Sequence, residues 1–252
     1  MTTKRIIPCL DIRNGKVVKG INFQGNKEVG DPLDLAVFYN AQGADELVFY
    51  DIDAAVENRG VFAELLKEIA AAVSIPLTVA GGVLTAEDFE RVLSLGADRV
   101  SINTGAIKKP GLVAGVSKAY GSERVVLAMD VKRADGRFTV FRSVGRENTG
   151  IDALEWARKG EADGAGELVL NSIDTDGVRG GFDIEILEAV SKVVSIPIVA
   201  SGGAGKREDF LDLFTKLPSI DAGLAASIFH NKELLIPDLK AYLKENKITV
   251  RF

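Results

Sequence analysis

Short apolar runs alternate along this chain with longer amphipathic stretches. The runs are continuous and bounded, which is typical of strands that are buried on both faces of a parallel sheet. Eight such runs occur, at 6–12, 46–52, 76–80, 99–103, 125–131, 167–173, 197–201 and 222–226. Between them the apolar spacing predicts helices, for example over 62–73, 86–95 and 184–194. Eight strand–helix units predict a closed (β/α)8 TIM barrel.

The second half of the chain repeats the first. ADELVFYDID at 44–53 is echoed by AGELVLNSID at 165–174, and SIPLTVAGG at 74–82 by SIPIVASGG at 195–203. Both repeats lie 121 positions apart, which indicates a duplicated four-strand unit. We therefore expect one barrel domain over 1–252, built from half-barrels at about 1–122 and 123–252. A doubly wound open sheet is the alternative, but it offers no reason for this two-fold repeat.

Composition narrows the class of protein. Of the 252 residues, 46% are hydrophobic and 27% charged, as in ordinary globular domains. The net charge of −5 argues against nucleic-acid binding and leaves a small anionic substrate open. The single cysteine excludes an internal disulfide and fits a cytoplasmic protein. We expect no membrane span and no signal peptide.

Glycine pairs follow two strands that are related by the repeat. Gly202–Gly203 comes before a strand that ends at Ala226–Ser227, and Gly81–Gly82 before a strand that ends at Asn103–Thr104. Backbone N–H groups of glycine-rich loops bind phosphate well, because the backbone can approach closely. Two equivalent sites at one mouth predict a long substrate with a phosphate at each end. Tight turns alone are the plainer explanation for either pair taken singly.

Asp11 and Asp130 end two further strands that the repeat relates. Reactive groups of such barrels lie at the C-terminal ends of strands. Two carboxyl groups in different environments can act as a base and an acid. Loop capping would explain either aspartate alone, but a two-fold pair between two phosphate sites favours catalysis. Asp176 and Gly177 follow the sixth strand and lie at the same edge.

Two connections are expected to cover the mouth. Residues 13–31 contain four spaced glycines with Lys16 and Lys19, which predicts a mobile loop whose lysine reaches the substrate. Residues 135–141 carry an Asp-Gly turn signal and predict a small hairpin.

The opposite barrel face is charged at the starts of strands. Arg5, Glu46, Arg99 and Glu167 are placed to close into a ring of salt bridges, which at this face usually serves stability. His230 is the only histidine and is interpreted as a packing residue, and Cys9 as a packed thiol that faces into the barrel with Asp11. No cluster of His, Cys and carboxylate residues has metal-site spacing in the sequence, so we predict no metal, and we expect no cofactor.

Several segments resemble the cyclase subunit of imidazole glycerol phosphate synthase, an enzyme family of histidine biosynthesis. They are KRIIPCLDI (4–12), GKVVKG (15–20), GADELVFYDI (43–52), GGV (81–83), GADRVSINT (96–104), GAGELVLNSIDTDG (164–177), ASGGAG (200–205) and LAASIFH (224–230). They occur in the family's order and span nearly the whole chain.

The resemblance implies a cyclase, a lyase that uses ammonia. Its substrate is a ribulosyl formimino aminoimidazole carboxamide ribonucleotide with two phosphates, and its products are imidazole glycerol phosphate and an aminoimidazole carboxamide ribotide. A separate glutaminase subunit at the N-terminal barrel face supplies the ammonia. The implied roles are a base (Asp11), an acid (Asp130), a mobile-loop lysine (Lys19), one phosphate site (Gly82, Asn103, Thr104), a second (Asp176, Gly177, Gly202, Gly203, Ala226, Ser227), an ammonia gate (Arg5, Glu46, Arg99, Glu167) and a partner-facing charge (Asp98).

Four positions depart from the family pattern. Asp53 and Ala55 stand where hydroxyl residues are usual, Val144 where the residue is small or polar, and Arg99 where lysine is usual. Arginine offers a fixed fork of donors, so the last exchange is expected to alter the gate.

Three other functions share parts of this pattern. The sister isomerase of the pathway has the same repeat, aspartates and phosphate sites, but the CLDI and VVKG motifs and the gate residues favour the cyclase. The strand 2 departures leave open a cyclase-like paralogue of another ammonia-using pathway. A non-catalytic glutaminase activator would need only the N-terminal face, and the intact glycines argue against it.

Overall fold

The computed structural model describes residues 3–21, 24–57 and 59–252, and these form a closed barrel of eight parallel strands. Each strand pairs in parallel with the next, and the last returns to the first through the register Arg5–Ala222 to Pro8–Ala225. The barrel strands are β1 (Arg5–Arg13), β4 (Leu47–Asp51), β5 (Leu77–Ala80), β6 (Arg99–Ile102), β7 (Val125–Ala134), β10 (Glu167–Ser172), β11 (Ile198–Ser201) and β12 (Ala222–Ala225). The eight predicted runs and the predicted TIM barrel are confirmed.

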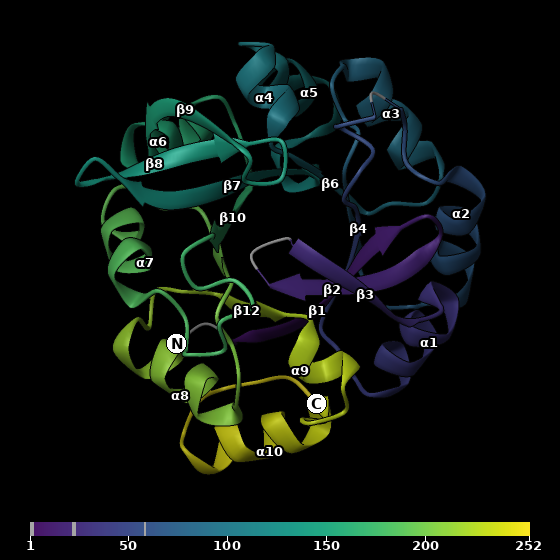
Figure 1. Ribbon diagram of the computed structural model, residues 1–252, viewed down its shortest axis with the longest axis vertical. Helices are drawn as coiled ribbons and strands as arrows, with labels where there is room; N and C mark the ends of the chain where they lie inside the picture. Colours follow the sequence, from purple (N-terminus) through teal and green to yellow (C-terminus); the bar gives the residue numbers. More distant parts are fainter. Residues whose placement is uncertain (1–2, 22–23, 58) are drawn as a thin grey trace.

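Helices surround the barrel (Figure 1). The outer ones are α1 (Pro32–Ala41), α2 (Ala63–Ala72), α3 (Ala86–Ser94), α5 (Leu112–Tyr120), α6 (Ala153–Ala162), α7 (Ile184–Ser191), α8 (Arg207–Lys216) and α10 (Ile236–Glu245). Two short ones, α4 (Thr104–Lys108) and α9 (Ser227–His230), begin directly after β6 and β12, and a 3-10 turn spans Ser122–Arg124. The main core, with Phe49, Phe89 and Phe210, is continuous, and a second cluster that includes Ile7, Cys9 and Val48 fills the barrel.

Local capping repeats across the two halves. Asp31 accepts hydrogen bonds from the first turn of α1, and Asp152 does the same for α6. Asp88 and Asp209 each accept two backbone N–H groups just before α3 and α8. These caps satisfy N–H groups that a helix leaves unpaired. They support the predicted division into half-barrels near residue 122, which stays a prediction.

Segment 13–31, predicted as a loop, is instead mostly a β-hairpin. β2 (Lys16–Ile21) pairs antiparallel with the end of β1 and with β3 (Gln24–Gly30). Asn14 and Gly15 have φ of 50° and 73°, the left-handed conformation of an Asn-Gly hairpin turn, and Val17 and Val18 are buried beyond it. Residues 22–23 of this segment lie outside the described residues.

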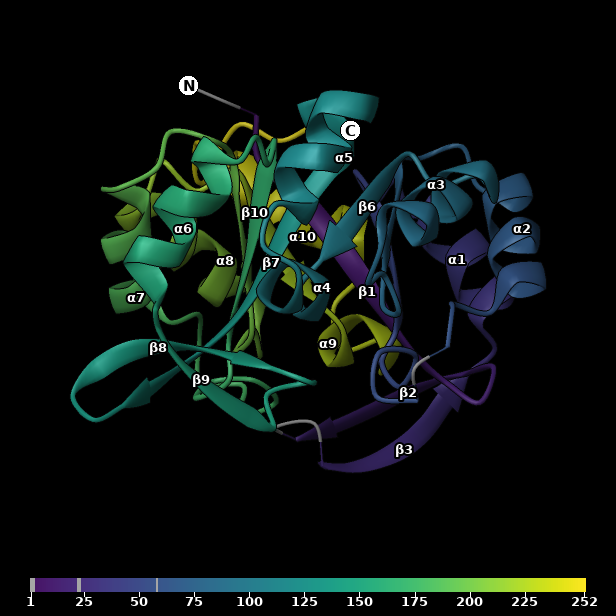
Figure 2. The ribbon, with the colours of Figure 1, turned by 90° about the horizontal axis from the view of Figure 1, so that it is seen from above.

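The hairpin predicted over 135–141 is confirmed and is longer than expected. β7 continues into β8 (Arg137–Arg142) through Asp135–Gly136, and β9 (Glu147–Asp152) adds a third strand. Figure 2 shows β2–β3 and β8–β9 projecting from one end of the barrel, with both termini at the other. Within the described residues, no helix is long and apolar enough to cross a membrane.

Candidate active site

A cavity opens at the C-terminal ends of the barrel strands, between the two hairpins. It encloses about 1260 Å³ including its open mouth. Most of the residues predicted for the site line it: Asp11, Lys19, Gly82, Asn103, Thr104, Asp130, Asp176, Gly177, Gly202, Gly203, Ala226 and Ser227. The structure therefore brings residues from seven strand ends and one hairpin into one space.

Eight inward-facing side chains line this cavity, and the strand register orders them as two quartets. Those of the first half are Asp11, Tyr50, Ala80 and Ser101. Those of the second half are Asp130, Asn171, Ser201 and Leu224. Each residue occupies the same place in its half as its mate in the other, so the backbone is two-fold symmetric while the chemistry differs.

Asp11 lies between a thiol and an ammonium group. Cys9 Sγ donates to its Oδ1 at 3.4 Å, and Lys19 Nζ donates to its Oδ2 at 3.1 Å. Lys19 also lies 3.6 Å from Asp176. These two carboxylates raise the pKa of Lys19 against the opposing effect of burial, so it stays charged. Of the two lysines expected in this segment, Lys19 lines the cavity and Lys16 pairs with exposed Asp31, and contact of either lysine with a substrate stays a prediction.

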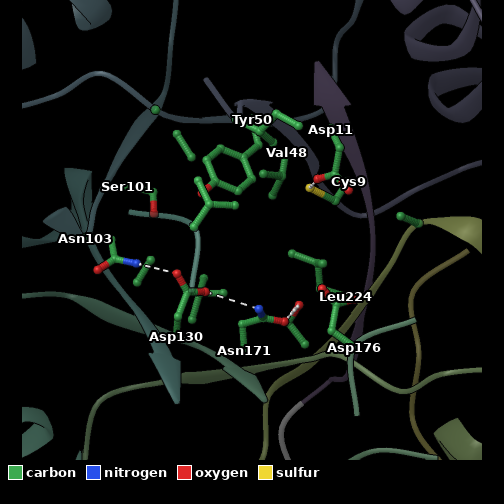
Figure 3. Close-up of a pocket in the computed structure, with 18 of the residues that line it drawn as sticks. Cys9, Asp11, Val48, Tyr50, Ser101, Asn103, Asp130, Asn171, Asp176 and Leu224 are labelled. Atoms are coloured by element: carbon green, nitrogen blue, oxygen red, sulfur yellow. Dashed lines mark hydrogen bonds between the residues drawn. The ribbon is translucent and has the colours of Figure 1, made fainter. Parts of the chain in front are cut away.

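Asp130 faces Asp11 across the cavity and is held by two amides (Figure 3). Asn103 Nδ2 donates to its Oδ2 at 2.9 Å, and Asn171 Nδ2 to its Oδ1 at 3.1 Å. Burial raises the pKa of Asp130 to about 6, while both amides oppose that rise. This carboxyl group can therefore carry a proton near neutral pH, as an acid catalyst must.

The two predicted phosphate sites have matching backbones. Asn103 and Ala226, which precede α4 and α9, have φ,ψ of −121°, −85° and −124°, −74°. Gly82 and Gly203 both have positive φ, 66° and 106°. A Cβ at Gly82 would lie 2.6 Å from the carbonyl oxygen of Arg59, and one at Gly203 would collide with that of Gly181. Only glycine fits either place, so the two loops offer equivalent backbone cradles at opposite sides of the mouth.

A buried ion pair supports the first cradle. Asp51 is fully buried, and Arg59 donates to both of its carboxylate oxygens at 2.5 and 3.0 Å. Burial raises the pKa of Asp51, and the guanidinium opposes that rise. Because the Arg59 carbonyl lies against Gly82, this pair fixes the loop below the predicted phosphate position.

The charged ring at the barrel floor is confirmed. Arg5 and Arg99 each bridge Glu46 and Glu167, and Thr78 Oγ1 donates to the remaining oxygen of Glu46 at 2.6 Å. All four carboxylate oxygens of the ring are thus occupied. Asp98 lies exposed at the same face and accepts a hydrogen bond from Leu77 N at 2.8 Å.

Three of the positions that depart from the family pattern, Asp53, Ala55 and Val144, lie at or near the cavity mouth, and the structure shows a partner for Asp53. Asp53 forms a two-bond ion pair with Arg13, at 2.6 and 2.9 Å, and so ties β1 to the end of β4. Val144 lines the cavity in the left-handed conformation, φ 59°, which is unusual for a β-branched residue. The preceding residue, Ser143, donates its N–H to Thr104 Oγ1 at 3.2 Å, so the β8–β9 turn rests on the first cradle. Ala55 also lines the cavity.

His230 is a packed residue, as predicted. It is buried, its Nδ1 lies 2.6 Å from Tyr39 Oη, and burial lowers its pKa to about 4.

The sequence analysis missed Asn171 and Ser201. Asn171 lies inside the apolar run of β10, and Ser201 is the last residue of β11, directly before the glycine pair that was taken as the end of that strand, so the choice of strand ends passed over both. Alternation along β10 was the available signal, because Glu167, Val169 and Asn171 share one face of the strand.

Comparison with known proteins agrees with this geometry. The family model described as histidine biosynthesis protein matches residues 5–235. A relative from Alkaliphilus metalliredigens is 50% identical over 252 residues, and one from Sulfolobus acidocaldarius 51% over 251, each covering both chains in full. One from Oceanobacillus iheyensis is 49% identical and is covered to 98% of its length. All three carry the name imidazole glycerol phosphate synthase subunit HisF.

This chain belongs to the HisF family of histidine biosynthesis. The resemblance stated from the motifs is confirmed. The relatives have the name of the cyclase subunit, which favours the cyclase over the sister isomerase. Membership in the HisF family leaves the role of each residue to be argued from the cavity.

Proposed function

We propose that this chain is the cyclase that uses ammonia to convert the bisphosphorylated ribulosyl formimino aminoimidazole carboxamide ribonucleotide to imidazole glycerol phosphate and aminoimidazole carboxamide ribotide. The observation that carries the proposal is the pair of unlike carboxyl groups, Asp11 beside an ammonium ion and Asp130 between two amides, across one cavity. Relatives of about 50% identity over the full length have the matching name.

The chemistry needs both groups. When ammonia adds to the ketose carbonyl, the oxygen gains a proton and the new C–N centre loses one. In the proposed mechanism Asp130, with its raised pKa, gives the first proton, and Asp11 accepts the second. The hydroxyl group then leaves as water, the new nitrogen closes the ring on the formimino carbon, and the bond from that carbon to the aminoimidazole carboxamide breaks, so that the leaving nitrogen needs a proton in turn. An acid and a base on opposite walls of the cavity can act in both ammonia addition and ring closure without rotation of the substrate.

The two cradles account for a phosphate at each end. Gly82, Asn103 and Thr104 would bind one, and Gly177, Gly203 and Ser227 the other. Asp176 would contact the substrate beside the second phosphate, where Lys19 offsets its charge. Holding both ends fixes the reacting atoms between the carboxyl groups, which is how enzymes reduce the entropic part of a barrier.

The floor ring suits controlled entry of ammonia. In the proposal, a glutaminase subunit docks at the N-terminal face near Asp98, and ammonia passes the Arg5–Glu46–Arg99–Glu167 ring. The names of the relatives, which call them subunits, support a partner. A cytoplasmic location belongs to the same proposal.

Turnover of the bisphosphate with ammonium salt at high pH, without a partner, tests the assignment. Asp11→Asn and Asp130→Asn should each lower kcat by about 10²–10⁴-fold while the circular dichroism spectrum is unchanged. The matched control is exposed Asp135→Asn, at the tip of the β7–β8 turn, which should retain turnover. Wild-type protein that binds the bisphosphate tightly but does not turn it over would refute the cyclase assignment.

A further inference from the structure

Three polar side chains in the second quartet form a chain of hydrogen bonds that ends on Asp130. Ser201 Oγ donates to Asn171 Oδ1 at 3.1 Å, and Asn171 Nδ2 donates to Asp130 Oδ1 at 3.1 Å. The three residues are register neighbours on β7, β10 and β11, so the backbone ladder itself fixes their order. Asn103 holds the other oxygen of Asp130 from the opposite side.

The first quartet lacks this arrangement although its backbone is equivalent. The mates of Asn171 and Ser201 are Tyr50 and Ala80, and the mate of Asn103 is Ala226. An alanine side chain cannot donate a hydrogen bond, so the hydroxyl and one of the amides have no counterpart beside Asp11. The amide cradle is thus a feature of one half of a symmetric barrel.

We propose that Asn171, with its amide oriented by Ser201, is a positioning residue that holds the Asp130 carboxyl group in place for proton transfer. The inference rests on the proposed role of Asp130 as the acid. A side-chain amide can face a carboxyl group with either its N–H or its C=O. The Ser201 hydroxyl engages Asn171 Oδ1, so the N–H remains directed at Asp130.

The orientation has a consequence for the proton on Asp130. An N–H donor stabilises the ionised carboxylate, whereas a carbonyl oxygen can accept only from the protonated acid. Ser201 therefore favours ionisation through Asn171 and offsets part of the cost of burial. Without the Ser201 hydroxyl, the Asp130 carboxyl group would bind its proton too tightly to release that proton near neutral pH.

Other titratable groups of the cavity act on Asp130 from several elements. Asp176, after β10, adds to the rise in its pKa, and burial together with the charge of Asp130 raises the pKa of Tyr50 on β4. Asp11 and Lys19 pair with each other, Cys9 donates to Asp11, and Asp51 is paired with Arg59. These groups stay in place when Asn171 or Ser201 is replaced, so the change in the Asp130 pKa reports the loss of the hydrogen bond.

Carbon-13 NMR titration of aspartate carboxyl groups tests the inference, with the Asp130 signal assigned by its loss in Asp130→Asn. In Asn171→Leu, which removes the donor at similar size, the Asp130 pKa should rise from about 6 to about 7 or higher, because the variant loses a hydrogen bond that stabilises the ionised carboxylate. Ser201→Ala should raise it in the same direction by less, and Ser201→Thr, which keeps a hydroxyl, should restore it.

The matched control is Ser101→Ala, which makes the same chemical change at another residue that lines the cavity, outside the Ser201–Asn171–Asp130 chain. It should leave the Asp130 pKa unchanged. If Asn171→Leu does not fold, Ser201→Ala against Ser101→Ala decides the question. Equal Asp130 pKa values in the wild type and Ser201→Ala, or in the wild type and folded Asn171→Leu, would overturn the inference.

Kinetics separate this inference from the proposed function. In Asn171→Leu, kcat should fall roughly tenfold with little change in KM, and the alkaline limb of the kcat profile should move up with the NMR pKa. Retained turnover in Asp130→Asn would remove the acid role of Asp130. The NMR titration would still show whether Asn171 holds that carboxyl group.

Discussion

Lys19 Nζ lies 3.1 Å from Asp11 Oδ2, so the β2–β3 hairpin is anchored to the wall of the cavity that it covers. The same ammonium group lies 3.6 Å from Asp176. One side chain thus links the hairpin, β1 and the β10–α7 connection. The hairpin position and the charge balance of the site are therefore coupled.

Lys19→Met should loosen the hairpin and raise the pKa of Asp176 further, because burial already raises it and Lys19 opposes that rise. We expect faster hydrogen exchange at the β2 amides and a fall in kcat. Lys16→Met is the control, since Lys16 pairs with exposed Asp31. Equal exchange in both variants would show that the Lys19 contact does not hold the hairpin.

Asp130 should make stability depend on pH. Its pKa in the folded protein, about 6, lies above the ordinary value of 3.8, so the folded state binds the proton more tightly. Stability is then unaffected below about pH 4 and decreases as the pH rises to about 6, by up to roughly 3 kcal/mol. Urea titrations measure this effect. Between about pH 4 and pH 6 the wild type should lose unfolding free energy relative to Asp130→Asn, whose side chain does not titrate. A difference that is constant from pH 4 to 7 would contradict the raised pKa.

Arg99→Ala should destabilise the barrel floor by about 1–3 kcal/mol, since it leaves buried Glu46 and Glu167 with Arg5 alone. Arg99→Lys should cost less, but a single ammonium group cannot reproduce two separately directed bonds. Urea unfolding measures both. The exposed pair Lys67–Glu64 supplies the control, because Lys67→Ala should change stability by less than about 0.5 kcal/mol.

Gly203→Ala should weaken binding of the bisphosphate, raising KM by roughly tenfold or more, because the added Cβ would displace the cradle from the Gly181 carbonyl. Gly180→Ala is a control at the same rim, where a Cβ meets open space. If both variants bind the bisphosphate as the wild type does, the cradle does not hold a phosphate.

Much of this architecture could be predicted from the sequence, because strands buried on both faces leave unbroken apolar runs and the repeat fixes their number. The glycine cradles followed from the same repeat. The Asn14–Gly15 dipeptide is a local sign of the first hairpin, and the expectation of a loop over 13–31 did not use it.

Contacts across strands were beyond the reach of sequence patterns. Asn171 meets Asp130 only through the register of β7 with β10, and Asp53 meets Arg13 only because β1 and β4 are neighbours. Neither pairing leaves a periodic signal along the chain. The unequal surroundings of the two aspartates therefore emerged only from the three-dimensional structure.

The unequal quartets give the cavity a direction. With two alike cradles, a ligand that carries a phosphate at each end could enter either way round, and the cradles alone would not distinguish the two poses. Asn171 and Ser201 on one wall, opposite Tyr50 and Ala80 on the other, make the poses chemically different. A reversed ligand would occupy both phosphate sites while its reacting atoms face the wrong carboxyl group. The side chains of the second quartet would therefore determine which of the two poses is productive.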